Sequence, residues 1–349
     1  AAEIIRGAGD ELAVIYAPSA ASPLLAGEGT KAAANLAIAA RGAAAAESLY
    51  LMPVESNVNG IRDMGIKPRD NGKALGEMLS GGVRALVVVG DNPMMLALDK
   101  DAVEASLKGL EALIVIDSLR TDTADLASVV LADLPSYGKD GTRTSADRRI
   151  GRVTKAEDAT GDQHDAIETL NAVAETLAVV LGKPYLSPGS DAETVMGEIA
   201  AVVSGYAEAT YDSLESGRTR ALPVTAPSKA EFQTVALQET PSTNGRLLLT
   251  TSRTLYTSLE GAAIRSEEAD KLHREEFLEM NPSDAAGLGI GQNRPVVVTN
   301  GSHELLLSAA LTDAVAPGSV YLPLYYDGGV VNRLLPADGT PVTVAVRPV

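Results

Sequence analysis

Three short apolar runs, each ended by a polar loop, constrain the fold more than any other feature of the sequence. They cover Ala85–Val89, Ala112–Ser118 and Val129–Leu131, and helical patterns lie between them. Short runs rich in β-branched residues and ended by turn formers are typical of strands buried on both faces of a parallel sheet. Strands that alternate with helices are joined by crossovers. The sequence therefore predicts an α/β fold.

The alternation extends toward the amino terminus. A strand is expected in Glu11–Ser19, a helix near Thr30–Ala40 and a second strand in Ser48–Pro53, which together predict a β-α-β unit. Three further helices follow from periodic apolar positions and end signals. They are expected at 71–82, 162–181 and 191–203.

The last part of the chain has a different pattern. Short β-like runs at 245–252, 294–312, 318–326 and 341–349 are separated by turn dipeptides such as Asn300-Gly301, which favours a closed β-barrel. One capped helix is predicted over Asn281–Ile290. Residues between Tyr211 and Phe232 lose periodicity, as linkers do. We therefore predict an α/β domain at 1–212, a linker at 213–232 and a barrel at 233–349.

The length, net charge and cysteine content of the chain exclude several classes of function. With 349 residues, two domains are expected rather than one. A net charge of −17 disfavours nucleic acid or an anionic membrane as partner. The absence of cysteine excludes disulfides, thiolate iron–sulfur ligation and a cysteine nucleophile. The three separated histidines are expected at the surface, so no metal site is predicted. Without an apolar span or signal peptide, a chain on the cytoplasmic side is expected, with no direct insertion into the membrane.

The loop Gly90–Pro93 is a candidate site, because ligands of open α/β sheets bind beyond the carboxyl ends of strands. Gly90 allows close approach of a ligand, and Asp91 and Asn92 offer polar side chains. A plain strand-to-helix turn explains the same residues. Neither a GxGxxG motif after a strand nor a GxxxxGK[ST] motif is present, which argues against a stand-alone nucleotide-binding protein.

Several longer stretches carry a family resemblance. They are NVNGIRDMGIKP at 57–68, ALVVVGDNP at 85–93, the segment 114–153, LLLTTSRTLYTSLEG at 247–261, the segment 278–301 and the segment 315–335. In this order and spacing they resemble the C-terminal half of molybdopterin oxidoreductases, and most closely the branch formed by the G-type subunits of respiratory NADH-quinone oxidoreductases. The resemblance implies a Rossmann-like parallel-sheet domain followed by a double-psi β-barrel.

The resemblance also implies where a dinucleotide would lie. Two loops match a guanosine-diphosphate site, and two barrel segments match the surroundings of the pterins. The implied cofactor-binding residues are Gly90, Asp91, Asn92, Pro93, Asp117, Ser118, Arg120, Thr121, Thr251, Ser252, Arg253, Asn332 and Arg333. No catalytic or metal-ligating residue is implied, because the iron–sulfur domain and the molybdenum ligand of the family precede the matching region.

Two functions follow from the resemblance. The first is a scaffold of the kind found in the NADH-quinone oxidoreductase branch, without a cofactor or redox centre of its own. It would pack beside an iron–sulfur domain or subunits of a respiratory NADH dehydrogenase, at the inner face of the membrane. The alternative is the cofactor-clasping half of a molybdopterin guanine dinucleotide enzyme such as formate dehydrogenase or nitrate reductase. The arginines of the loop Lys139–Arg152 would then pair with phosphate, or otherwise with acidic groups of the upstream domain.

Overall fold

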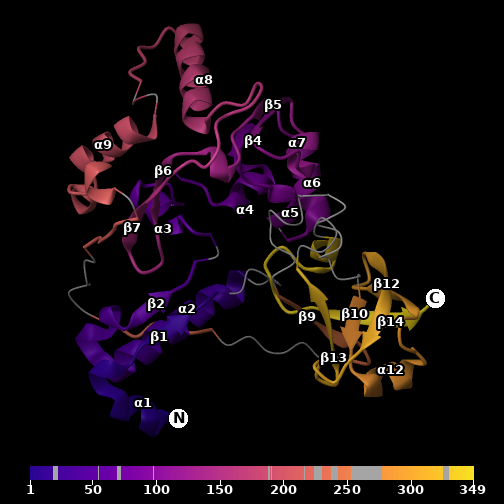
Figure 1. Cartoon of the computed structure of the whole chain (residues 1–349). Coiled ribbons are helices and arrows are strands. Elements are labelled where there is room, and N and C mark those ends of the chain that lie inside the picture. Colours follow the sequence, from indigo (N-terminus) through magenta and orange to yellow (C-terminus); the bar gives the residue numbers. More distant parts are fainter. Residues whose placement is uncertain are drawn as a thin grey trace.

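The computed structural model describes most of the chain. The described residues are 1–18, 23–53, 55–68, 72–96, 98–187, 189, 191–215, 217–223, 230–236, 243–252, 277–324 and 330–349. Figure 1 shows three assemblies: a small N-terminal unit, a larger α/β part with α8 at its outer end, and a barrel near the C-terminus. None of the described helices is both long and apolar enough to cross a bilayer.

The N-terminal unit is the predicted β-α-β arrangement. Helix α1 (Ala2–Ala8) precedes β1 (Val14–Tyr16), and α2 (Pro23–Arg41) connects β1 to β2 (Leu49–Leu51), which pairs parallel to β1. Its core is small and consists of Val14, Ala37 and Ala45. The short helices α3 (Val58–Asp63) and α4 (Leu75–Glu77), followed by a π-helical turn (Met78–Gly82), lead to the next sheet.

The second sheet contains the three apolar runs. Strands β3 (Ala85–Val89), β4 (Ala112–Asp117) and β5 (Val129–Ala132) pair in parallel in that order. The connections contain α5 (Pro93–Leu96), α6 (Lys100–Lys108) and α7 (Asp122–Asp125). Val88, Leu113 and Val115 pack against these helices in one core. The parallel α/β prediction is confirmed, although β1 and β2 form a separate sheet, because strand pairing depends on contacts that local patterns do not encode.

The prediction that these strands are buried on both faces is confirmed for β4, in which Val115 and Ile116 are fully buried, and is wrong for β3 and β5. Val87 and Val89 are 48% and 41% exposed, and Val129 at the edge is 46% exposed. Successive side chains of a strand point to opposite faces, so these residues share the face opposite Val88. The reason is that the core helices of the crossovers pack against the Val88 face.

A small antiparallel sheet follows. Strands β6 (Gly141–Thr144) and β7 (Arg149–Val153) form a hairpin where a polar loop is expected from the sequence. Strand β8 (Thr219–Ala221) pairs with β7 inside the segment expected to be a linker, because β7 supplies its backbone partners. The predicted helices are α8 (Ala166–Leu181) and α9 (Ala192–Val202). Met196 of α9, Ile150 of β7 and Leu214 share a third core.

The last strands close into a six-stranded barrel. They are β9 (Leu247–Ser252), β10 (Phe277–Met280), β11 (Pro295–Thr299), β12 (Glu304–Leu311), β13 (Ser319–Pro323) and β14 (Thr343–Pro348), in the order β10-β12-β11-β14-β9-β13. If β9, β10 and β11 are exchanged in that order with β12, β13 and β14, every strand pairing and its direction stay the same. For example, the parallel pair β10 and β12 becomes the parallel pair β13 and β9. The barrel therefore has twofold pseudosymmetry in its connections.

Helix α12 (Pro282–Leu288) confirms the capped helix. The Asn281 side chain accepts from the Ser283 backbone N–H at 3.0 Å, and Gly289 ends the helix with φ 69°. The barrel interior contains Leu278, Met280, Val296 and Val320, all fully buried. The same core includes Met95 and Leu98 from the β3–α6 connection, so the barrel packs directly on the α/β part.

Candidate functional site

Polar side chains gather where β3, β4 and β5 end. The register places Val89 beside Ile116, and Asp117 beside Ala132, so the segments after the three strands share one edge. The Gly90 backbone N–H donates to the Ile116 carbonyl at 2.8 Å, and Gly90 has φ 60°, which a side chain would strain. This edge is the usual place for a ligand in an open parallel sheet.

The loop after β3 is held by side-chain hydrogen bonds. Asp91 Oδ1 accepts from the Asn92 backbone N–H at 2.7 Å. Asn92 is buried, and its Oδ1 accepts from Thr123 Oγ1 at 2.7 Å. Thr123 Oγ1 in turn accepts from the Met94 backbone N–H at 3.1 Å. Asn92 therefore fixes the loop to α7, and Asp91 is the residue of this loop best suited to meet a ligand.

The loop after β4 contains a second carboxyl group. Asp117 Oδ1 accepts from the Leu119 backbone N–H at 2.9 Å. Thr121 caps α7 by accepting from the Ala124 backbone N–H at 3.1 Å. Arg120 is highly exposed and pairs with Asp125 at 2.6 Å. Ser118 is half-buried between Asp117 and Leu119. Arg120 and Thr121 thus have local partners, whereas Asp117 lies at the shared strand edge.

Burial raises the pKa of both carboxyl groups. For Asp91 the main cause is desolvation, with smaller contributions from the charges of Glu55 and Asp117. For Asp117 desolvation is again the main cause, opposed by backbone hydrogen bonds and reinforced by Asp133. A carboxyl group kept in surroundings that disfavour its charge is a candidate functional group.

Replacement of Asp91 by Asn tests this electrostatic cost. Because the pKa of Asp91 is raised in the folded state above its ordinary 3.8, the folded protein binds the proton more tightly. The free energy of unfolding therefore falls as the pH rises from the ordinary pKa of Asp91 through its raised pKa in the folded state. We expect Asp91→Asn to raise the free energy of unfolding by about 0.5–1 kcal/mol near pH 7. The gain should shrink toward pH 4, as measured by urea unfolding.

Asp158→Asn is the matched control. The pKa of Asp158 is lowered by its hydrogen bond with Lys155, so its ionised form favours folding and no gain is expected. An equal stabilisation by both substitutions would mean that the overall negative charge, and not the surroundings of Asp91, determines the effect.

Two predicted barrel residues lie against the β3–α6 connection. Asn332 and Arg333 belong to the 3-10 helix Val330–Leu334. Asn332 is fully buried and donates from Nδ2 to the Met95 carbonyl at 2.9 Å, while its own carbonyl accepts from the Asp99 backbone N–H at 3.1 Å. The structure thus brings Asn332 against Met95, which follows the Gly90–Pro93 loop closely in the chain.

Asp101 of α6 makes two further contacts between the barrel and the α/β part. Its Oδ1 lies 3.1 Å from Arg333 Nε, and its Oδ2 lies 2.6 Å from His303 Nε2. His303 follows β11, and Asp101 lies in the first turn of α6. The His303 side chain is 32% exposed, so it lies at the surface as expected, but it pairs with Asp101 because the barrel turn is docked on α6. No local pattern links residues so far apart in the chain.

The other predicted barrel residues lie elsewhere. Thr251 pairs with Leu322 in β13, and Ser252 Oγ is 2.9 Å from Tyr321 Oη. Among the described residues, their contacts are thus with the barrel wall and not with the strand-end loops. Arg253 lies outside the described residues.

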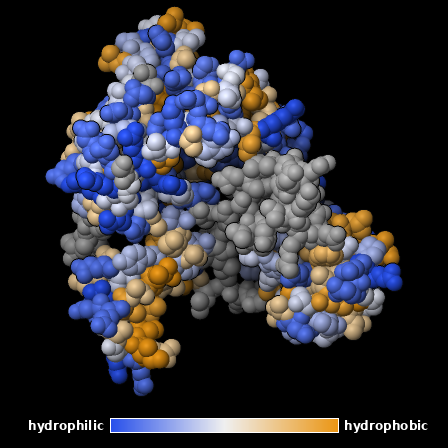
Figure 2. Space-filling view, in the orientation of Figure 1, coloured by the Kyte–Doolittle hydropathy of each residue, from blue (hydrophilic) through white to orange (hydrophobic). Residues whose placement is uncertain are grey.

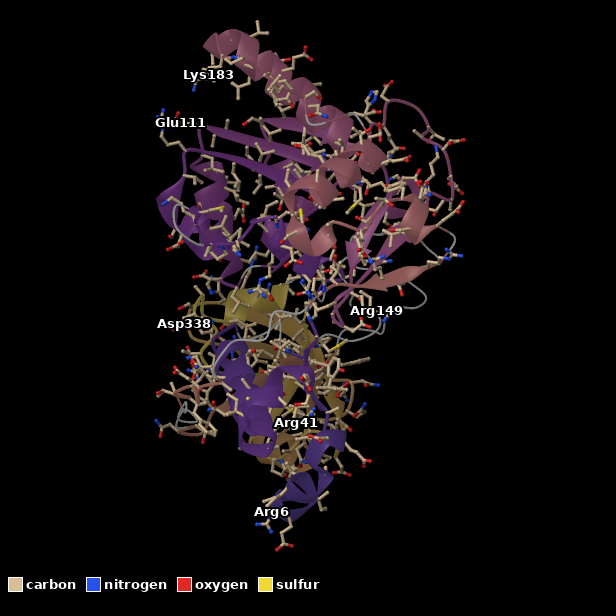
Figure 3. All side chains as sticks on the ribbon, turned by 90° about the vertical axis from the view of Figure 1, so that its left-hand side faces the viewer. Arg6, Arg41, Glu111, Arg149, Lys183 and Asp338 are labelled. Carbon is tan, nitrogen blue, oxygen red and sulfur yellow. The ribbon has the colours of Figure 1, made fainter. Side chains whose placement is uncertain are left out.

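The arginines of the β6–β7 hairpin contact other residues of the same chain. Arg148 Nη1 lies 2.7 Å from Asp63 Oδ2, and Tyr206 Oη donates to the same oxygen at 2.7 Å. Arg149 donates to Thr219 Oγ1, and Arg152 stacks 4.3 Å from the centre of the Tyr211 ring. Figure 3 shows Arg149 near the lower end of the α/β part. Within the described residues the carboxylate partner of Arg148 thus comes from α3, and pairing of these arginines with phosphate or with an upstream domain stays a prediction.

Comparison with known proteins identifies the class. Residues 12–176 match the model of the family described as Molybdopterin oxidoreductase, and residues 247–347 match that of the Molydopterin dinucleotide binding domain. Both models match in chain order, over the parallel sheets and over the barrel. The chain belongs to the molybdopterin oxidoreductase family.

Its relatives have several functions. The chain is 32% identical over 278 residues to F420-dependent formate dehydrogenase 1 subunit alpha of Methanococcus maripaludis, covering 72% of the chain and 40% of that protein. It is 28% identical to NADPH-Fe(3+) oxidoreductase subunit alpha of Geobacter sulfurreducens, with 92% and 40% covered. Identity to a G-type NADH-quinone oxidoreductase subunit of Rhizobium meliloti is 28%, with 80% and 32% covered.

A solved structure shares the fold. Acetylene hydratase from Pelobacter acetylenicus superposes with a TM-score of 0.65 at 13% identity, over 78% of this chain and 46% of that one. The chain thus spans less than half of the length of each of these four proteins.

Proposed function

We propose that the chain holds the dinucleotide end of a molybdopterin guanine dinucleotide cofactor within an oxidoreductase of the formate dehydrogenase kind. The observation that carries the proposal is the pair Asp91 and Asp117 at one strand edge, where burial raises the pKa of each. A carboxylate accepts hydrogen bonds from N–H groups such as those of guanine. The relatives named as formate dehydrogenase subunits support this choice.

The proposal assigns a part to each predicted group. The sheet β3-β4-β5 would be Rossmann-like and the barrel of the double-psi type, within the division 1–212, 213–232 and 233–349. The side chains of Asp91, Asp117 and Ser118 would hold the guanine, and the backbone of the loop Gly90–Pro93 would lie along the phosphates. Asn332 and Arg333 would lie toward the pterins. The cofactor supplies the redox chemistry, whereas these residues bind and orient it.

The side chains at the strand ends suit the guanine better than they suit the phosphates. Three cations that follow or precede the strand ends already pair with carboxylates: Lys139 with Asp133, Lys100 with Asp122 and Arg120 with Asp125. Phosphate oxygens would therefore be bound mainly by backbone N–H groups of the strand-end loops, as is common at such edges.

The same ion pairs favour a second candidate. An edge whose cations are neutralised from within the chain is stable without an anionic ligand, which suits a scaffold without a cofactor of its own. The Rhizobium meliloti relative supports this candidate. The chain would then assemble with iron–sulfur subunits of a respiratory NADH dehydrogenase at the cytoplasmic face of the membrane.

Guanine and metal analysis of the intact complex tests the proposal. We expect near-stoichiometric guanine nucleotide after acid release, together with molybdenum or tungsten. In Asp117→Ala the guanine content should fall at least about tenfold, because hydrogen bonds to a charged acceptor contribute about 1.5–3 kcal/mol each. Asp91→Ala should lower it as well.

Glu111→Ala is the control for Asp117→Ala. Glu111 precedes the same strand, β4, but is exposed and contacts Arg84, so guanine retention should not change. Absence of both guanine and metal from a wild-type complex that still oxidises its electron donor would contradict the proposal and favour the scaffold.

A further inference from the structure

An apolar groove lies between β5 and α8, away from the strand-end loops. It has a volume of about 690 Å³. One wall contains Leu131 and Ala132, and the other contains Ala172, Val173 and Val180. The chain enters α8 through a backbone hydrogen bond from His164 N–H to the Ala132 carbonyl at 3.2 Å. The segment that leads into α8 is therefore tied to the end of β5.

Helix α8 is apolar and has no buried residue along its 16 residues. Val173, Leu177 and Val180 face the groove and are 37%, 53% and 77% exposed. Figure 2 shows hydrophobic surface at the outer end of this helix. On its other side, Asn171 Nδ2 donates to the Gly189 carbonyl, so the segment after α8 contacts the helix there. Helices of globular proteins normally bury their apolar face, and this one leaves it open.

The neighbouring sheet face is only partly open. Val87, Val89 and Val129, which face away from the core helices, are partly exposed, whereas Ile116 on the central strand is fully buried. Leu131 lies beside Ile116 on this face and lines the groove. The part of the face that is still uncovered is therefore its edge at β5, where the groove lies.

The charges around the groove select the partner. Asp162 and Glu168 line it at the amino-terminal end of α8, together with His164, whose Nδ1 lies 3.7 Å from Glu168 Oε2. Lys183 lies beyond the opposite end of the helix, at the outer tip of the molecule (Figure 3). A second copy of the chain, with a net charge of −17, would bring the same acidic end and a strong mutual repulsion.

We propose that this groove docks one helix of a partner polypeptide. The helix is apolar along one face and carries lysine or arginine at the end that contacts Asp162 and Glu168. The inference is independent of cofactor binding, because none of the described residues predicted to bind the cofactor lines the groove.

Single cysteines make the docking measurable, since the chain has no cysteine of its own. We expect Val180→Cys to react with a maleimide at least about tenfold more slowly in the complex isolated from cells than in the purified chain. Leu306→Cys is the control, because Leu306 is comparably exposed, at 69%, on the barrel. Its rate should be the same in both samples. Equal rates for Val180→Cys would overturn the proposal.

A crosslinker identifies the occupant. Thr169→Cys places a thiol on the groove wall next to Glu168, and a maleimide–amine reagent attached there should capture a lysine of another polypeptide. Peptide sequencing should show apolar residues at helical spacing beside that lysine. Capture of this same chain would establish a second copy instead, and capture of a segment without that spacing would also contradict the inference.

Charge reversal tests the acidic end separately. Glu168→Lys should weaken partner retention at least about fivefold in a salt-dependent manner. Glu175→Lys makes the same change on α8 at an exposed position that does not line the groove, so retention should stay the same. An equal loss from both substitutions would show that the net charge of the chain matters and not the groove.

Discussion

Asp63→Ala is expected to lower the free energy of unfolding by about 2–3 kcal/mol. The Asp63 carboxylate accepts from both Arg148 and Tyr206, each at 2.7 Å, and so joins α3 to the β6–β7 hairpin and to the segment after α9. Its removal leaves a partly buried guanidinium and a buried hydroxyl without this acceptor. Arg148 also has a φ of 62°, a conformation that depends on such support. Urea unfolding measures the loss.

The Tyr206 hydroxyl provides a second readout. Burial, with a smaller contribution from the hydrogen bond to Asp63, raises its pKa to about 12. In Asp63→Ala this pKa should fall but stay above the ordinary value, because burial is the larger cause. Ultraviolet titration of the phenolate checks it.

Asp125→Ala serves as the comparison for Asp63→Ala. Asp125 pairs with Arg120 at 2.6 Å, but both side chains are largely exposed. Exposed ion pairs contribute about 0–1 kcal/mol, so the loss should be small. A loss as large as that of Asp63→Ala would mean that Asp63 acts only as an ordinary surface charge.

Leu278→Ala is expected to destabilise the protein by about 3 kcal/mol. Leu278 lies in β10 and is fully buried in the barrel core. Truncation leaves a cavity that neighbours such as Val296 and Val320 cannot fill, since their strands are fixed by pairing on both sides. Because Met95 and Leu98 belong to the same core, the packing of the barrel on the α/β part should weaken too. Denaturant unfolding followed by circular dichroism measures both.

Leu306→Ala is the matched control for Leu278→Ala. It makes the same substitution in barrel strand β12, but Leu306 is 69% exposed. The free energy of unfolding should change by less than about 0.5 kcal/mol. Similar losses at the two positions would argue against the burial that the structure assigns to Leu278.

Most strands could be predicted because their apolar residues form short uninterrupted or alternating runs. The three parallel strands, the β1 and β2 pair and most of the barrel strands have this signal. Strands β6 and β7 lack it, because Gly141–Thr144 and Arg149–Val153 are mainly polar and are held by pairing with each other and with β8. Strand β10 is too short to stand out from the capped helix that follows it.

The candidate site could be predicted only where the chain places its residues next to a strand end. Asp91 and Asp117 lie at the ends of β3 and β4, so a local pattern finds them. Asp101, His303 and Asp63 act through partners that lie far away in the chain, and no spacing rule connects such residues. The open face of β3 escapes prediction for a related reason: an apolar run shows that burial is favourable, but not which layer provides it.

The pseudosymmetric barrel also restricts how the chain can be synthesised and folded. Among the described pairings, each strand of β9-β10-β11 pairs only with strands of β12-β13-β14. During translation the first three strands therefore leave the ribosome without these hydrogen-bonding neighbours. Strand β9 has to wait for β13 and for β14, the last strand of the barrel. Barrel closure is thus a late event that depends on contacts between residues far apart in the chain, which are slow to form. Of the barrel strands, Leu247–Ser252 stays unpaired longest during synthesis and most needs protection from aggregation.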